Sequence, residues 1–254
     1  MEKIFRLEHQ GEAKYALGNP EGPGWYRLEG DPFGDYAAGP PIDAGDARVL
    51  PPVEPSKIVA VGLNYRDHAR EMDKPLPAEP LIFIKPSTAV VGPGDAIVLP
   101  AISARVDHEA ELGVVIRKRA HAVPAARAAE YVWGLTCVND VTARDLQRRD
   151  VQYTRGKGFD TFAPVGPCVA VGLEPDALDV ESWVNGVQRQ RSNTRELIFP
   201  IAQLIEFITS VMTLLPGDVI ATGTPSGVGP LAVGDQVVIK VEGIGELANR
   251  VVAS

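Results

Sequence analysis

The chain has 254 residues, of which 45% are hydrophobic and 23% are charged. This composition is typical of a globular protein with a sizeable core, and it excludes a wholly disordered or coiled-coil chain. The 25 basic and 33 acidic side chains give a net charge of −8, which argues against a nucleic-acid-binding protein.

The sequence predicts neither membrane insertion nor secretion. No apolar run approaches the ~18 to 20 residues that a membrane helix requires, and the first ten residues lack the apolar region of a signal peptide. Cys137 and Cys168 are isolated and have no CxxC spacing, so we expect free, buried thiols. A cytoplasmic protein is therefore expected.

The first fifty residues predict a small antiparallel β-sheet. Short alternating apolar runs are separated by Gly- and Pro-containing turns, with the runs at 4–7, 13–17 and 25–28 and the turns at 18–20 and 22–24. The stretch 39–55 is rich in Pro, Gly and Asp and is typical of a linker. We therefore predict a small β-rich N-terminal domain over 1–50 and a second domain over 51–254.

The second domain is also rich in strand-length runs with many β-branched residues, at 57–62, 81–85, 96–100, 111–118, 218–223 and 236–241. Three of these runs follow a Gly-Asp pair, which is typical of a turn, and Asn185-Gly186 predicts a hairpin. Helical patterns are fewer and cover only 124–130, 142–149 and 200–214. The prediction is a mostly β fold of the α+β class, built on a rolled or barrel-like mixed sheet.

Three acidic residues lie where a metal site could form. Glu109 and Glu111 are two residues apart on a predicted strand, so both carboxylates point to one face. Asp140 ends another apolar run, and if the two strands are neighbours, three carboxylates converge. Oxygen ligands select hard cations such as Mg²⁺ or Mn²⁺. The alternatives are a solvated strand start for the two glutamates and a helix N-cap for Asp140.

Other polar residues could act on a substrate. His68 and Glu71 become neighbours if their segment is helical, and a carboxylate on one ring nitrogen makes the other a better base. Lys157 lies between two glycines and could approach an anionic ligand closely. The glycine-rich segment 223–229 matches no nucleotide motif, but its N–H groups and the Thr224 hydroxyl could hold a carboxylate. A surface ion pair and an exposed loop lysine remain as alternatives for His68–Glu71 and Lys157.

Taken in order, the motifs resemble the fumarylacetoacetate hydrolase family over residues 57–243. The segments that carry the resemblance are KIVAVGLNYRDHAREM, PLIFIKPSTAVVGPGDAIVLP, RVDHEAELGVVI, YVWGLTCVNDVTARDLQ, GKGFDTFAPVGP and LLPGDVIATGTPSGVGP. The family's rolled, mostly β catalytic domain and its homodimeric habit are implied by the resemblance. The short N-terminal part and the single copy of the core resemble the compact branch of acylpyruvases, decarboxylases and isomerases.

The resemblance also implies roles for single residues. The family's ligands for Mg²⁺, or Mn²⁺, correspond to Glu109, Glu111 and Asp140. The family's active-site lysine corresponds to Lys157, and the lid pair that moves a proton or activates water corresponds to His68 and Glu71. Substrate contacts correspond to Arg144, Gln147 and Thr224.

The hypothesis is a metal-dependent enzyme that acts on small 2-oxo and 2-hydroxydienoic acids through a metal-stabilised enolate. The favoured reaction is isomerisation of 2-hydroxyhepta-2,4-diene-1,7-dioate, and decarboxylation of such a dioate is considered as an additional activity. Acylpyruvate hydrolysis and oxaloacetate decarboxylation are alternatives, and a non-catalytic β-rich binding or scaffold protein is the alternative of another class. A second substrate carboxylate would need an additional cation, for which the candidates are Arg66, Arg70, Lys74 and Arg144.

Overall fold

The main structural element is a long mixed β-sheet that runs through both halves of the chain. The computed structural model describes residues 1–9, 11–18, 24–43, 45 and 47–254. The strands follow the order β4-β3-β2-β1-β14-β12-β11-β17-β6-β7, and β5 and β8 attach to β1 and β14. Their bounds are β1 (Glu2–His9), β2 (Glu12–Gly18), β3 (Trp25–Gly30), β4 (Tyr36–Ile42), β5 (Arg48–Leu50), β6 (Lys57–Gly62), β7 (Leu81–Pro86), β8 (Val90–Val91), β11 (Ala110–Ile116), β12 (Val132–Asn139), β14 (Ala163–Val171) and β17 (Val219–Ala221).

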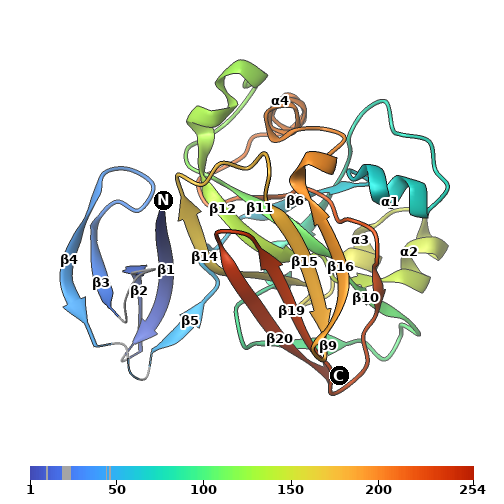
Figure 1. Ribbon diagram of the computed structural model, residues 1–254, viewed down its shortest axis with the longest axis horizontal. Helices are drawn as coiled ribbons and strands as arrows, with labels where there is room; N and C mark the ends of the chain where they lie inside the picture. The colour runs from blue at the N-terminus through green and yellow to red at the C-terminus, as the bar shows by residue number, and fades with distance from the viewer. Residues whose placement is uncertain (10, 19–23, 44, 46) are drawn as a thin grey trace.

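The N-terminal strands form an antiparallel meander, as the alternating apolar runs predict. β1 pairs with β2, β2 with β3, and β3 with β4. β1 also pairs with β14, with Ile4 opposite Val169, so the meander continues the main sheet (Figure 1). The division into two domains at residue 50 stays a prediction. The predicted turns and linker of this part include residues 19–23, 44 and 46, which lie outside the described residues.

A second sheet, ordered β16-β15-β19-β20-β9, packs against the middle of the main sheet. Leu112 of β11 and Leu135 of β12 share one buried apolar cluster with Ile239 of β19 and Leu247 of β20. The core therefore lies between the sheets, and the predicted mostly β, rolled mixed fold is confirmed. The remaining strands are β9 (Ala96–Leu99), β15 (Asp179–Val184), β16 (Val187–Asn193), β19 (Gln236–Val241), β20 (Gly245–Ala253) and, in a third small sheet, β10 (Val106–His108), β13 (Thr142–Ala143) and β18 (Gly229–Pro230).

Three strands begin at the predicted Gly-Asp turns. Gly94, Gly217 and Gly234 have φ angles of +80°, +83° and +94°, a conformation that glycine adopts without a steric penalty. In each turn the carboxylate of the following aspartate accepts a hydrogen bond from the backbone N–H three residues earlier. The aspartate therefore closes the turn before the strand starts. The predicted hairpin at Asn185-Gly186 joins β15 to β16.

The helices are short, as predicted, but their ends differ from the sequence pattern. The helix predicted over 200–214 ends at Val211, because Met212 is extended and Leu214 pairs with Ala120. The segment 124–130 forms a 3-10 helix, and the segment predicted to be helical from residue 142 begins as β13. The helices are α1 (Arg66–Glu71), α2 (Arg144–Asp150), α3 (Thr154–Lys157) and α4 (Ile201–Val211), with 3-10 helices η1 (Ser87–Ala89), η2 (Ala125–Tyr131) and η3 (Thr194–Glu196).

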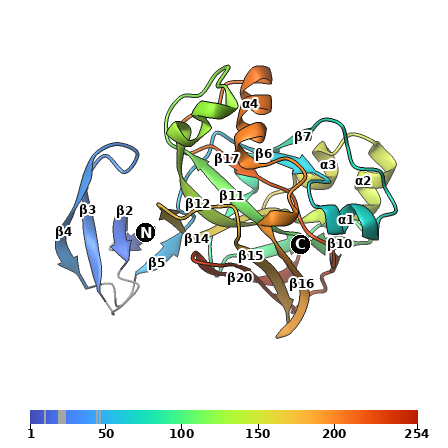
Figure 2. The same cartoon turned by 45° about the horizontal axis from the view of Figure 1, so that its top comes forward.

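Helices α1, α2 and α3 gather at the end of the molecule that lies opposite the N-terminal strands (Figure 2). Within the described ranges no helix has the length and apolar character needed to cross a bilayer. Cys137 and Cys168 are free and buried, as predicted, and burial raises the pKa of both thiols. The polar residues that the sequence singles out lie near α1, α2 and α3 instead.

Candidate active site

Two neighbouring strands bring three carboxylates together. β11 pairs antiparallel with β12, and Glu111 lies opposite Val138. Glu109 immediately precedes β11 and Asp140 immediately follows β12, and the Asp140 N–H donates to the Glu109 carbonyl at 2.9 Å. Side-chain oxygens of Glu109, Glu111 and Asp140 lie within 4.8 Å of one another, and all three residues are buried. The two strands are neighbours, so the condition for the three carboxylates to converge is met, and Asp140 caps no helix because α2 begins only at Arg144.

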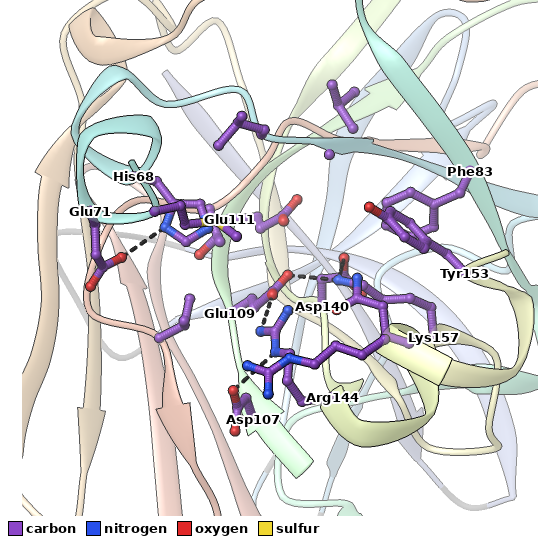
Figure 3. Close-up of a pocket in the computed structure, with 18 of the residues that line it drawn as sticks. His68, Glu71, Phe83, Asp107, Glu109, Glu111, Asp140, Arg144, Tyr153 and Lys157 are labelled. Atoms are coloured by element: carbon purple, nitrogen blue, oxygen red, sulfur yellow. Dashed lines mark hydrogen bonds and ion pairs between the residues drawn. The ribbon is translucent and has the colours of Figure 1, made fainter. Parts of the chain in front are cut away.

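Two cationic side chains compensate part of this negative charge (Figure 3). The Lys157 ammonium donates to Glu109 Oε2 at 2.7 Å and to Asp140 Oδ2 at 2.6 Å. Arg144 donates to the other oxygen of Glu109. Burial acts to raise the pKa of the Glu109 carboxyl, but the charges of Lys157 and Arg144 outweigh it and hold that pKa well below its ordinary value. Glu109 is therefore ionised and firmly oriented.

Glu111 differs from the other two carboxylates because no described cation pairs with it. Its Oε2 accepts a hydrogen bond from the Gly223 N–H at 2.9 Å. Burial, followed by the charges of Asp140 and Glu109, raises the pKa of the Glu111 carboxyl well above its ordinary value. A buried set of three oxygen donors with one uncompensated charge fits a hard divalent cation such as Mg²⁺ or Mn²⁺. The triad is therefore a chemically suitable cation site.

A buried lysine that the sequence analysis did not single out forms an ion pair with Asp140 of the triad. Lys85 of β7 is fully buried, and its ammonium lies 2.5 Å from Asp140 Oδ1 and 3.2 Å from the Val141 carbonyl oxygen. Burial lowers the pKa of Lys85, although the charge of Asp140 opposes this shift. A signal was present in the sequence, because Lys85 interrupts an apolar run two residues after Phe83 and so shares its face.

The predicted contact between His68 and Glu71 forms on α1. His68 Nδ1 lies 2.9 Å from Glu71 Oε2, and the other oxygen of Glu71 accepts the Gly227 N–H at 3.0 Å. Asp67 fixes the start of the helix, because its carboxylate accepts the hydroxyl of Ser192 at 2.6 Å. A proton on Nδ1 would be donated to the Glu71 carboxylate, and Nε2 is the ring nitrogen that Glu71 does not contact. Both side chains line the cavity that holds the carboxylates (Figure 3).

Arg144 is held in place by a second carboxylate that the sequence analysis also missed. Asp107 is almost fully buried and accepts from Arg144 Nε at 3.0 Å and from Arg105 Nε at 2.8 Å. Gln147 accepts from Arg144 Nη1 at 2.9 Å, which leaves the Gln147 amide N–H groups for a ligand. The Arg144 guanidinium is therefore oriented before any substrate binds. The sequence signal that could have identified Asp107 is the charged residue at every second position of the segment 105–109, which places these side chains on one face of a strand.

The glycine-rich segment 223–229 binds carboxylates, but these are side chains of the protein itself and not the substrate carboxylate that was expected. Its Gly223 and Gly227 N–H groups bind Glu111 and Glu71. The Thr224 hydroxyl donates to the Ala110 carbonyl at 2.9 Å and accepts from Gln190 Nε2 at 2.8 Å. The segment therefore positions Glu111 of the candidate cation site and Glu71 of the His68–Glu71 pair, and the Thr224 hydroxyl has no proton left for a substrate carboxylate.

The glycines beside Lys157 serve packing and not ligand approach. A Cβ at Gly156 would lie 3.0 Å from Gln147 Cα, and one at Gly158 would lie 2.6 Å from the Thr154 carbonyl oxygen. The first contact lets α3 pack closely on α2, and the second lets the chain turn back over the end of α3. Lys157 is buried with only 3% of its surface exposed. The alternative of an exposed loop lysine is therefore wrong.

One cavity of about 400 Å³ collects the candidate residues. All nine predicted site residues line it, from α1, the β11 and β12 ends, α2, α3 and the glycine-rich segment. Its wall also contains residues that the sequence analysis did not assign, among them Phe83, Arg105, Asp107, Arg148 and Tyr153. Periodicity could not identify these residues, because they come from segments that meet only in the folded chain.

Comparison with known proteins gives consistent results. Residues 57–252 match the family described as Fumarylacetoacetate (FAA) hydrolase C-terminal. The chain is 43% identical over 226 residues to the mitochondrial oxaloacetate tautomerase FAHD2A of Bos taurus, covering 84% of this chain and 72% of that protein.

Solved structures of similar proteins superpose on this chain over nearly its whole length. A 5-carboxymethyl-2-hydroxymuconate delta-isomerase from Mycobacterium smegmatis is 45% identical, with a TM-score of 0.93 over 99% of this chain and 100% of that one. A 2-hydroxyhepta-2,4-diene-1,7-dioate isomerase from Mycobacterium marinum is 41% identical, with a TM-score of 0.92 over 100% and 99%. A maleylpyruvate hydrolase from Sphingobium sp. SYK-6, in complex with manganese and pyruvate, is 31% identical, with a TM-score of 0.81 over 99% of each chain. The chain belongs to the fumarylacetoacetate hydrolase family.

Proposed function

We propose that the chain is a metal-dependent enzyme that acts on 2-oxo and 2-hydroxydienoic acids, with isomerisation of 2-hydroxyhepta-2,4-diene-1,7-dioate as its reaction. The observation that carries this proposal is that one cavity is lined by both the His68–Glu71 pair and the three buried carboxylates. The two isomerases that share its fold at 45% and 41% identity support the choice of reaction. Mg²⁺ is the proposed cation, and the manganese bound by the maleylpyruvate hydrolase supports Mn²⁺ as an alternative.

The walls of the cavity bind and polarise the substrate. Glu109, Glu111 and Asp140 would hold a divalent cation, which would supply Lewis-acid stabilisation of negative charge on the 2-oxo oxygen. Arg144 and Lys157 are oriented cationic donors on the same wall, and they attract the 1-carboxylate that is next to this oxygen. The reacting end of the substrate is thereby directed to the buried part of the cavity.

His68 moves the proton. Its free Nε2 accepts the proton of the 2-hydroxyl group and returns a proton to a carbon of the conjugated chain, which converts the dienol to the 2-oxo form. Glu71 keeps the ring in the required tautomer through its contact with Nδ1 at 2.9 Å. The Gly227 N–H in turn holds Glu71, so the acid-base pair does not depend on solvent for its orientation.

Oxaloacetate is the second candidate substrate, and its keto-enol interconversion or decarboxylation uses the same groups. The 43% identity with an oxaloacetate tautomerase favours this candidate. Acylpyruvate hydrolysis is a third candidate, in which His68 would activate a water molecule. A non-catalytic binding protein would have no need for an oriented acid-base pair beside the carboxylates.

An activity panel tests the proposal. The protein is assayed by absorbance with 2-hydroxyhepta-2,4-diene-1,7-dioate, oxaloacetate and acetylpyruvate, each with Mg²⁺ and with excess EDTA. We expect Mg²⁺-dependent turnover of the dienoate, abolished in His68→Gln and retained in Arg149→Gln, an exposed change outside the cavity. No turnover of any compound with Mg²⁺ demonstrably bound would contradict the proposal.

We also propose that the protein is a homodimer, which rests on the family resemblance. Light scattering at micromolar concentration is expected to give twice the mass of one chain. A mass of one chain would contradict this proposal.

A further inference from the structure

The charges that line the cavity balance one another before a cation binds. Five cationic side chains and five carboxylates line it, if the His68 imidazole is counted as neutral: Lys74, Arg105, Arg144, Arg148 and Lys157 against Glu71, Asp107, Glu109, Glu111 and Asp140. A divalent cation in the carboxylate triad would leave two positive charges in excess. The buried ammonium of Lys85 beside Asp140 adds a further positive charge, so the cavity with a bound cation would favour a dianion over a monoanion.

The excess positive charge can be located. Arg105, Arg144 and Lys157 each form an ion pair with a carboxylate of the cavity. Over the part of the chain that the structure describes, Lys74 and Arg148 have no ion-pair partner, although both line the same cavity. Both side chains are exposed, which places them toward the solvent side of the cavity. They are therefore available to an anionic group of a ligand.

Helix α2 sets the position of Arg148 relative to the metal site. Arg144, Gln147 and Arg148 are related by i, i+3 and i+4 spacing, and all three line the cavity. Arg144 contacts Glu109 of the triad, and Arg148 lies one turn further along α2, about 6 Å along the helix axis.

Lys74 reaches the cavity from the other side. It follows α1, and its backbone N–H donates to the Ala69 carbonyl at 3.0 Å, which ties it to the end of that helix. The other two cations considered on α1 are engaged elsewhere. Arg66 donates to the Leu197 carbonyl at 2.8 Å, and Arg70 lies 3.6 Å from Glu196. Neither of them is among the residues that line the cavity.

We propose that Lys74 and Arg148 bind the second carboxylate of the substrate and make the enzyme selective for dicarboxylates over monocarboxylates of the same length. This inference rests on the proposed function, because it assumes that the first carboxylate binds near the triad. The two residues are specificity determinants and take no part in the proton transfer. Their removal weakens binding of the diacid and leaves the reacting end of the substrate unchanged.

Two acids of equal length test the inference by binding and not by turnover. The Mg²⁺-loaded protein is titrated by calorimetry with 2-oxoheptanedioate and with 2-oxoheptanoate, which lacks only the terminal carboxylate. We expect the diacid to bind about tenfold more tightly to the unaltered protein. Arg148→Gln and Lys74→Gln are each expected to remove most of this preference, without changing the affinity for 2-oxoheptanoate.

Arg149→Gln is the matched control. It removes the same charge from the adjacent position of α2, but Arg149 does not line the cavity and lies 3.7 Å from Asp150. The preference for the diacid should persist in this variant. Equal affinities of the two acids for the unaltered protein, or a preference that survives in both Arg148→Gln and Lys74→Gln, would overturn the inference. If neither acid binds the Mg²⁺-loaded protein, the proposed function itself fails and the inference fails with it.

Discussion

Glu109→Gln and Glu111→Gln are expected to change the stability of the metal-free protein in opposite directions. Both substitutions preserve side-chain size, and each removes one negative charge at a pH where both carboxyls are ionised. Glu109 forms ion pairs with Lys157 and Arg144, so its neutralisation leaves two cations with weaker compensation. Glu111 faces two other carboxylates without a cationic partner among the described residues, so its neutralisation relieves repulsion. In Glu111→Gln, the amide oxygen of the new side chain can still accept the hydrogen bond from Gly223.

The expected magnitudes follow from the distances. The ligand atoms of the triad lie within 4.8 Å of one another, and two unit charges at that distance interact with about 3.5 kcal/mol at an effective dielectric constant of about 20. Lys157 contacts both neighbours of Glu111 and offsets part of this repulsion, so Glu111→Gln should stabilise by about 1 to 2 kcal/mol. That gain corresponds to a rise in Tm of about 2 to 8 °C for a chain of this size. Glu109→Gln should destabilise by about 3 kcal/mol, because it breaks a buried ion pair.

Thermal unfolding with excess EDTA and with saturating Mg²⁺ measures these effects. Unaltered protein should gain about 2.7 kcal/mol when Mg²⁺ is present at a hundred times its dissociation constant. Both variants should lose most of that gain. Shifts of the same sign in EDTA for the two variants would refute the reasoning that Glu111 alone is uncompensated. A full Mg²⁺-dependent gain in either variant would refute its assignment as a ligand.

Three further predictions concern the groups around the triad. Lys85→Met should destabilise the metal-free protein by about 3 kcal/mol, measured by urea unfolding, because buried Asp140 loses one of its two cations; an unchanged midpoint would contradict this. Glu71→Gln should lower kcat while leaving the Mg²⁺ dissociation constant unchanged, and a parallel loss of metal affinity would show that the pair is not a separate unit. Gly227→Ala should reduce both stability and kcat, since φ is +94° and a Cβ would lie 2.2 Å from a backbone carbonyl oxygen; normal activity would argue against a positioning role for this N–H.

The strands and turns were largely predictable because their causes are local. A glycine followed by an aspartate closes a turn through bonds that span only three residues, and three strands begin at such turns. The helix boundaries were less predictable because their causes are distant. Leu214 continues the apolar stripe of α4, but its backbone pairs with Ala120, and this contact ends the helix earlier than the pattern indicates.

The candidate site likewise contains residues that local patterns could identify and residues that only distant contacts place there. Glu109, Glu111 and Asp140 could be selected from their positions at the ends of apolar runs, and His68 and Glu71 could be paired from helical spacing. Lys85 and Asp107 could not be assigned to the site in this way. Their role depends on which buried charges they meet, and those partners lie 55 and 37 residues away along the chain.

The sequence by itself therefore determined the fold class, the turn positions and the residue types available for a hard cation and for proton transfer. These properties depend on side-chain periodicity and backbone conformation, which act over a few residues. Among the described residues, the tertiary structure alone decided which carboxylate lacks a counter-charge, which backbone N–H group holds Glu71 of the His68–Glu71 pair and which cations of the cavity remain unpaired. Electrostatic compensation is a property of distance in space, and only the packed chain brings those charges together.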